Sequence, residues 1–191
     1  MLFRSMFSKY YPDFIKNNLN YTYVEPFFGG GAVYWSLNSQ KNIINDIDGD
    51  LINFLTTLKE SPNVIIEMSK DISNRISEIS IKEKNGIITM SEAKTKRGLI
   101  YYEWRNKDRN NGLNNLSNIE RAFRFLLVNQ LAFNGMRRFN SKGEFNIPYG
   151  NYKSININLS DKHVELLQRT DIHCGSYKQV MLDNDRDNTF I

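Results

Sequence analysis

The chain of 191 residues has a single cysteine, Cys174, and only two histidines, His163 and His173. One cysteine excludes an internal disulfide framework and any site built from several cysteine ligands. The two histidines stand ten positions apart in the sequence, a spacing that matches no common metal-ligand pattern. We therefore expect neither a disulfide nor a metal site.

Long apolar runs are also lacking, since no stretch approaches the roughly 20 residues that a membrane-spanning helix needs. Residues 1–7 lack the layout of a signal peptide. We expect a cytoplasmic protein, in a bacterial, phage or viral context, with no membrane partner. A hydrophobic content of 40% and an aromatic content of 13% are typical of a globular core.

The net charge of +4 is modest, but its distribution along the chain is uneven. Acidic residues gather between Glu25 and Asp50, and basic residues gather in the stretches 94–109 and 121–142. The second stretch contains no Asp or Glu. This pattern indicates that a polyanion meets the middle of the chain. Solvated helix faces would give the same pattern, so charge alone does not decide between the two interpretations.

The first motif runs from Tyr23 to Tyr34 and joins an apolar strand to a turn of three glycines. A second apolar stretch follows and ends in the carboxylate of Asp46. Glycines let a backbone come close to a ligand, and an acidic residue at the end of the second strand can accept both hydroxyls of a ribose. The motif is typical of a nucleoside-binding site, although a glycine-rich turn that binds no ligand would have the same sequence pattern.

The residues before the glycines indicate which ligand the motif prefers. A pyrophosphate cradle needs small residues there, whereas this chain has Glu25, Pro26 and two phenylalanines. A carboxylate disfavours an anion and favours a ligand with a positive charge and an aromatic base. S-adenosylmethionine has an ammonium, a sulfonium and an adenine. A dinucleotide-dependent oxidoreductase is a weaker alternative, because no Gly-x-Gly-x-x-Gly turn begins with small residues.

Periodicity and capping signals predict an α/β sheet that is interrupted by a run of helices. The expected strands cover residues 21–27, 42–45, 171–174 and 189–191. The expected helices cover residues 31–37, 48–58, 62–79, 91–104, 119–133, 161–168 and 177–181.

The second motif, residues 125–150, is dense in side chains that read DNA bases. Asn and Gln amides match the hydrogen-bonding edge of adenine, and Arg matches guanine or phosphate. Aromatic side chains stack on bases or fill a vacated base position. Phe125 and Phe133 have helical spacing that favours the core, and Asn134-Gly135 would equally suit a helix C-cap.

Together the two motifs resemble those of the Dam-type (D12 class) DNA N6-adenine methyltransferases. The resemblance rests on Val24-Glu-Pro-Phe-Phe-Gly-Gly-Gly-Ala-Val-Tyr34, Asn45-Asp-Ile-Asp-Gly-Asp-Leu-Ile52, Phe133-Asn-Gly-Met-Arg-Arg-Phe-Asn140 and Lys142-Gly-Glu-Phe-Asn-Ile-Pro-Tyr-Gly150. It implies a Rossmann-like methyltransferase sheet, interrupted by a helical target-recognition insert. The corresponding domains are a partial catalytic domain, residues 1–55 and 146–191, and a DNA-binding domain, residues 56–145.

The resemblance also implies a reaction, a cofactor and site residues. A methyl group would pass from S-adenosylmethionine to the amino nitrogen of an adenine flipped out of double-stranded DNA, as in restriction–modification systems. Flipping a base costs a few kcal/mol. The implied cofactor site consists of Glu25, Pro26, Phe27, Gly29, Gly31 and Asp46. The implied DNA site consists of Asn129, Gln130, Asn134, Arg137, Arg138, Asn140, Lys142, Asn146 and Tyr149.

The chain departs from the family pattern in two places. It contains no Asp-Pro-Pro-Tyr type motif, which orients the target adenine, and no Gly-Gly-Lys segment before the first strand. We therefore expect a methyltransferase truncated at both ends, with no catalytic residue in this chain and no activity alone. The alternatives are a catalytically dead DNA-binding module and a subunit completed by a second chain that holds the missing motif.

Overall fold

The computed structural model describes residues 21–37, 39–155 and 160–191 of the chain. The chain forms two compact units, Met1–Glu60 with Leu159–Ile191, and Ser61–Asn158. The segment before residue 21, where the family pattern would have its Gly-Gly-Lys segment, lies outside the described residues.

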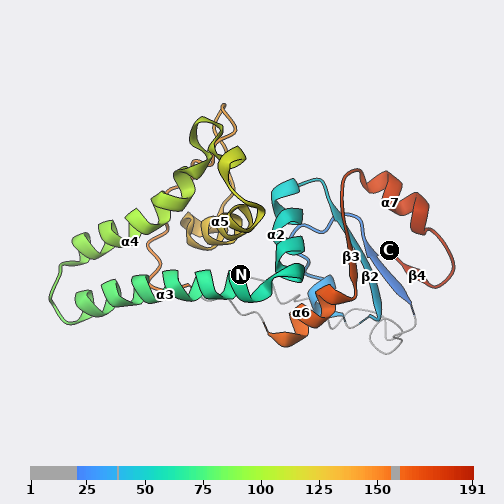
Figure 1. Ribbon diagram of the computed structural model, residues 1–191, viewed down its shortest axis with the longest axis horizontal. Helices are drawn as coiled ribbons and strands as arrows, with labels where there is room; N and C mark the ends of the chain where they lie inside the picture. The colour runs from blue at the N-terminus through green and yellow to red at the C-terminus, as the bar shows by residue number, and fades with distance from the viewer. Residues whose placement is uncertain (1–20, 38, 156–159) are drawn as a thin grey trace. The chain divides into compact units, whose positions relative to one another are not determined.

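The first unit contains a parallel sheet of four strands in the order β3-β2-β1-β4 (Figure 1). The strands are β1 (Thr22–Glu25), β2 (Lys41–Asp46), β3 (Thr170–Cys174) and β4 (Thr189–Phe190). Val24 pairs with Ile43, and Ile44 pairs with Ile172, which places the apolar residues of adjacent strands side by side. This sheet confirms the predicted α/β class.

Helices of the first unit cover the sheet. They are α2 (Gly49–Glu60), α6 (Asp161–Gln168) and α7 (Tyr177–Asn184). Helix α2 packs on β2, β3 and α6, and α7 packs on β2. Val180 of α7 lies in one buried cluster with Val24 and Ile43. Helix α7 therefore helps to bury the apolar residues of β1 and β2.

The predicted helix over residues 31–37 is wrong, because only a 3₁₀ turn, η2 (Tyr34–Ser36), forms there. Gly31 has a left-handed φ of +62°, which cannot start a right-handed helix, and Leu37 is extended. Tyr34 is fully buried and its hydroxyl bonds the Thr170 side chain at 2.7 Å. The aromatic anchor and the glycine conformation thus replace the helix with a tight turn.

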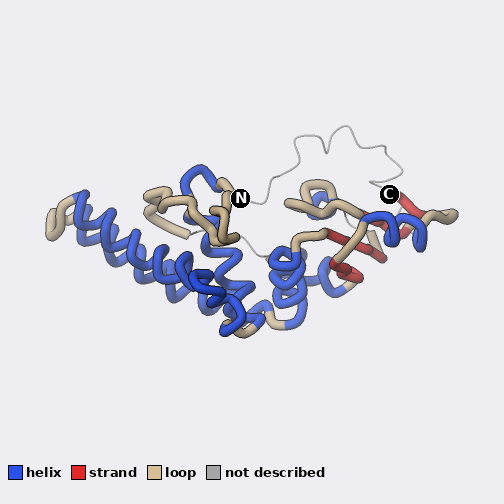
Figure 2. The backbone as a smooth tube through the Cα atoms, turned by 90° about the horizontal axis from the view of Figure 1, so that it is seen from above, coloured by secondary structure: helices blue, strands red, loops and turns tan. Residues whose placement is uncertain are grey.

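The second unit is built on three helices that pack on one another, α3 (Pro62–Lys84), α4 (Met90–Arg105) and α5 (Asn118–Leu131) (Figure 2). Capping boxes at Thr89 and Ser117 fix the starts of α4 and α5. The 3₁₀ segment η3 (Asn106–Asn115) joins these two helices. Among the described helices, none is both long and apolar enough to cross a membrane.

The chain returns from this bundle through the segment 132–155. Antiparallel bridges join Ala132 to Tyr149 and Phe139 to Phe145, so residues 133–149 fold back as a hairpin. Tyr101 of α4 donates its hydroxyl to the Ile147 carbonyl at 2.9 Å. Residues 146–155 accordingly fall in the second unit, whereas the resemblance implied that residues from 146 onward belong to the catalytic domain.

Helix α5 ends at Leu131, two residues before the predicted end. Ala132 is extended, and the 3₁₀ turn η4 (Phe133–Gly135) follows with Asn134 at a φ of +54°. The expectation that Phe133 belongs to the core is wrong, since its side chain is 47% exposed. The early end of the helix turns this ring outward.

Candidate functional site

Asp46 and Gly29 meet at the carboxyl ends of the parallel strands, where α/β sheets bind ligands. The Gly29 N–H donates to Asp46 Oδ2 at 2.7 Å, and the Asp48 N–H donates to Asp46 Oδ1 at 3.0 Å. A carboxylate offers about four acceptor positions, so two remain for a ligand. The structure thus brings together the two residues on which the predicted nucleoside site depends.

Asn45, which was not among the predicted site residues, connects the loops around Asp46 by hydrogen bonds. Its Nδ2 donates to the Pro26 carbonyl and to the Gly175 carbonyl, both at 3.0 Å. Its own carbonyl accepts from the Phe28 N–H at 2.9 Å. Because Asn45 is 1% exposed, these bonds are shielded from water. In the sequence, this role is indicated only by a polar residue that follows the apolar pair Ile43-Ile44.

The three glycines of the turn have different surroundings. Apart from the chain neighbours, no atom of the described residues lies within 4 Å of a Cβ placed on Gly29 or Gly30, so none of these residues fills the space in front of them. A Cβ on Gly31 would overlap the Phe28 ring and lie 2.7 Å from Trp35 Nε1. Gly29 is therefore placed for close approach of a ligand, while Gly31 is required by packing within the protein.

Glu25 ends β1 beneath this turn. Burial raises the pKa of its carboxyl from 4.5 to about 7, against hydrogen bonds from the Tyr23 hydroxyl and the Tyr34 backbone that lower it. The Tyr23 bond is 2.9 Å long. A partly desolvated carboxylate of this kind is stabilised by a nearby cation. Such a perturbed group at the end of a strand is typical of a functional site.

We expect the free energy of unfolding to fall as the pH rises from about 4.5 to about 7, because folded Glu25 holds its proton to a higher pH than the unfolded chain does. The full effect is about 3 kcal/mol. Glu25→Gln should remove this fall and exceed the wild type in stability above about pH 7. Urea unfolding over a pH series measures it. Exposed Glu165 provides the control Glu165→Gln, and equal pH profiles for both variants would contradict the assignment.

Phe27 forms an aromatic pair beside the turn. Its ring is 67% exposed and lies 4.6 Å from the ring of Tyr177 at the start of α7. Tyr177 was missed, since the two residues are far apart in sequence. Pro26 is buried and contributes its carbonyl to Asn45. Among the described residues, no group of three His, Cys, Asp or Glu side chains could hold a metal.

In the second unit, Arg138 and Asn146 face each other across the hairpin. Arg138 Nε donates to Asn146 Oδ1 at 2.9 Å, and the Asn146 N–H donates to the Arg138 carbonyl at 3.0 Å. Arg138 is exposed. Its guanidinium is thus oriented by Asn146, and the structure brings together two of the predicted DNA-binding residues.

The remaining basic residues of the hairpin are exposed, whereas one amide is used internally. Arg137 lies 5.0 Å above the Phe125 ring and 5.9 Å above the Phe139 ring. Asn140 Nδ2 donates to Glu144 Oε2 at 2.8 Å, and its Oδ1 accepts from the N–H groups of Lys142 and Glu144 at 3.0 Å. Asn140 therefore shapes the turn that presents the exposed Lys142 side chain.

The other four predicted DNA-binding residues differ in their exposure and in whether they already bond other groups of the protein. Tyr149 is 8% exposed, packs 5.6 Å from the Tyr101 ring and donates its hydroxyl to the Tyr152 carbonyl. Asn129 donates to the Phe125 carbonyl at 2.7 Å within α5. Gln130 is half-buried in the same helix, and Asn134 is exposed in η4. Tyr149 and Asn129 are thus already engaged with the protein.

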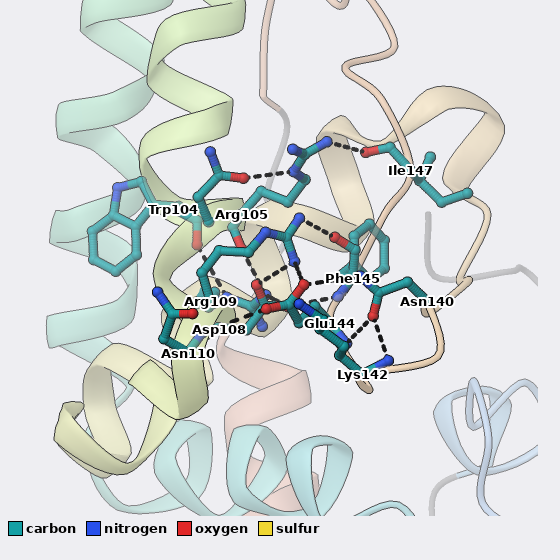
Figure 3. A network of polar contacts seen from close by, with 12 residues as sticks. Trp104, Arg105, Asp108, Arg109, Asn110, Asn140, Lys142, Glu144, Phe145 and Ile147 are labelled. Carbon is teal, nitrogen blue, oxygen red and sulfur yellow. Dashed lines mark hydrogen bonds and ion pairs between the residues drawn. The ribbon is translucent and has the colours of Figure 1, made fainter.

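Asp108, a further residue that the sequence reading missed, anchors the hairpin (Figure 3). Its carboxylate accepts from Arg124 Nη2 at 2.6 Å, from Arg109 Nη1 at 2.9 Å and from the Phe145 N–H at 2.6 Å. Arg109 Nη2 donates in turn to the Phe145 carbonyl at 2.8 Å. The side chain of Asp108 is only 3% exposed. One buried carboxylate therefore connects η3, α5 and the hairpin.

The first unit has the architecture of a nucleoside-binding α/β domain, with a carboxylate and an open glycine turn at the carboxyl edge of a parallel sheet. The profile of the D12 class N6 adenine-specific DNA methyltransferases matches residues 10–191. The chain belongs to this family.

Named relatives support the assignment. The chain is 36% identical to the type II methyltransferase M1.LlaDCHI of Lactococcus lactis subsp. cremoris, over 71% of this chain and 40% of the relative. It is 34% identical to the type II methyltransferase M.MjaIII of Methanocaldococcus jannaschii, over 83% of this chain and 52% of the relative. It is 31% identical to the DNA N-6-adenine-methyltransferase of Escherichia phage P1, over 83% of this chain and 18% of the relative. The chain thus spans about half of these relatives or less.

Proposed function

We propose that this chain provides the S-adenosylmethionine site and the DNA-recognition unit of an adenine-specific DNA methyltransferase. The observation that supports this most is the placement of Asp46 against the open Gly29 turn at the carboxyl edge of the sheet. When bound, S-adenosylmethionine supplies an electrophilic methyl group on its sulfonium. The residues of the chain bind and orient the two reactants.

The residues at the carboxyl edge fit this cofactor. Asp46 retains acceptor positions for the two ribose hydroxyls. Glu25 offers a carboxylate whose raised pKa would return toward its usual value beside the cofactor's positive charge. The exposed Phe27 and Tyr177 rings offer faces for adenine. Each part of the cofactor therefore has a partner of matching chemistry.

Asp46→Ala should weaken the binding of S-adenosylmethionine by about tenfold to 100-fold, because hydrogen bonds to a charged group contribute about 1.5–3 kcal/mol. Isothermal calorimetry of the full chain measures the affinity. Asp187→Ala, in an exposed turn of the same unit, is the control and should bind as the wild type does. Equal affinity for Asp46→Ala and the wild type would remove Asp46 from the site.

The hairpin of the second unit supplies the proposed DNA contacts. Arg137, Arg138 and Lys142 are exposed on it, and the Phe133 and Phe139 rings beside them are each 47% exposed. Cationic groups next to exposed aromatic rings suit a duplex from which one base is withdrawn. Neutralising phosphates would make the affinity fall steeply with salt.

The chain contains no Asp-Pro-Pro-Tyr type motif to hold the adenine amine. We accordingly propose that this chain binds the cofactor and DNA. Methyl transfer would then require the motif from a polypeptide segment other than residues 1–191, such as a second chain. Incubation with tritiated S-adenosylmethionine and duplex DNA tests this. The expected result is no label in N6-methyladenine, and labelled N6-methyladenine would contradict it.

A further inference from the structure

The η3 segment presents a group of polar side chains beside the hairpin. Within it, Asn110, Asn111, Asn114 and Asn115 are all exposed. Lys107 is half-buried, with its ammonium 4.6 Å above the Trp104 ring. The exposed side of this loop therefore consists largely of amides, which both donate and accept hydrogen bonds.

Two consecutive asparagines of the loop have left-handed backbones. Asn110 has φ +55° and ψ +41°, and Asn111 has φ +60° and ψ +24°. Asparagine is one of the few residues other than glycine that adopt this region readily, because its short amide can hydrogen-bond the nearby backbone. Both residues are exposed at this turn.

The carboxylates of this corner are bonded to other groups of the protein. The Asp108 side chain is 3% exposed between Arg109 and Arg124, and that of Glu144 is 15% exposed beside Arg109. Glu120 is engaged by the backbone and hydroxyl of Ser117 in the capping box of α5. The carboxylates are therefore neutralised or hydrogen-bonded, while the exposed asparagines leave amides at the surface, and amides are among the groups that contact phosphate.

The loop is connected directly to the hairpin (Figure 3). The Asn110 N–H donates to Glu144 Oε1 at 3.4 Å, and Arg109 bonds the Phe145 carbonyl at 2.8 Å. These bonds join residues far apart in sequence within the second unit. A duplex held by the hairpin would consequently meet the asparagine loop as part of the same surface.

We propose that Asn110 and Asn111 form a second DNA contact, which holds the phosphate backbone of the duplex next to the segment bound by the hairpin. This inference rests on the proposed DNA binding and extends it to a loop outside the 129–149 region. Neutral amides bind phosphate oxygens without releasing counterions and without reading sequence. The loop therefore adds affinity equally on duplexes of any sequence, and it leaves the dependence of affinity on salt concentration unchanged.

The test is the double variant Asn110→Gly/Asn111→Gly, which keeps the left-handed backbone and removes both amides. Fluorescence anisotropy of the full chain with two labelled duplexes of unrelated sequence, each over a salt series, measures binding. We expect a loss of about tenfold to 100-fold on both duplexes with an unchanged salt slope. Asn188→Gly, an exposed left-handed asparagine of the first unit, is the matched control and should bind normally.

Wild-type affinity in the double variant, a loss confined to one duplex, or an equal loss in Asn188→Gly would overturn the inference. A second variant, Asn110→Asp/Asn111→Asp, also tolerates the left-handed backbone and places negative charge toward phosphate. It should lose more affinity than the glycine variant, and normal binding would overturn the inference independently. If the wild-type chain bound neither duplex, the proposed function itself would fail.

Discussion

Asp108→Ala is expected to destabilise the second unit by about 3–5 kcal/mol, the cost of removing one partner of a buried ion pair. The substitution leaves the 7%-exposed Arg124 side chain without its carboxylate. It also removes the acceptor of the Phe145 N–H, which is 2.6 Å from Asp108. The hairpin would then lose the carboxylate that joins it to Arg124 of α5.

Thermal unfolding and urea titration of the full chain measure this loss. Asp71→Ala is the matched control, since the Asp71 side chain is 69% exposed in its ion pair with Arg75 and surface pairs contribute at most about 1 kcal/mol. Asp108→Asn should fall between the two, because it keeps an acceptor but loses the charge. Stability of Asp108→Ala within the range of the Asp71 control would show that the network does not hold the hairpin.

Gly31→Ala is expected to destabilise the first unit by roughly 2–5 kcal/mol. The left-handed backbone at a φ of +62° costs about 1–2 kcal/mol for a residue with a Cβ. Overpacking against the Phe28 ring and Trp35 adds about 1–3 kcal/mol. Because Phe28 also bonds the Asn45 carbonyl, a shift of its ring would disturb the loop that faces Asp46.

Gly30→Ala provides the comparison for this prediction. Gly30 lies next to Gly31, but its backbone is not left-handed, and apart from its chain neighbours no atom of the part of the chain that the structure describes lies within 4 Å of its Cβ position. Differential scanning calorimetry should therefore find Gly30→Ala close to the wild type in stability. If both variants unfolded at the same temperature, the packing role assigned to Gly31 would be wrong.

The sequence alone predicted the arrangement of the first unit well, because its signals are local. The strands ending at Glu25 and Asp46 are adjacent and parallel, so their ends had to meet. The predicted helix over residues 31–37 does not form, and helix propensity alone does not include the reason. Gly31 is left-handed, and Phe28 and Trp35 leave no room for a Cβ at this position.

Long-range pairing limited what the sequence could predict in the second unit. Asp108 looked like one more charge in a mixed stretch, yet it bonds Phe145 across the fold. Asn140 looked like a base reader, but its amide is occupied by the turn around Glu144. Whether a polar side chain is free for a ligand depends on neighbours that only folding brings together.

The most direct test of the account is a crystal structure of the chain with S-adenosylhomocysteine, which has the nucleoside but no methyl group to transfer. We predict that the ribose hydroxyls lie within hydrogen-bond distance of Asp46 and that the adenine lies against Phe27 or Tyr177. A nucleoside bound elsewhere on the chain, with Asp46 bonded only to Gly29 and Asp48, would contradict the account.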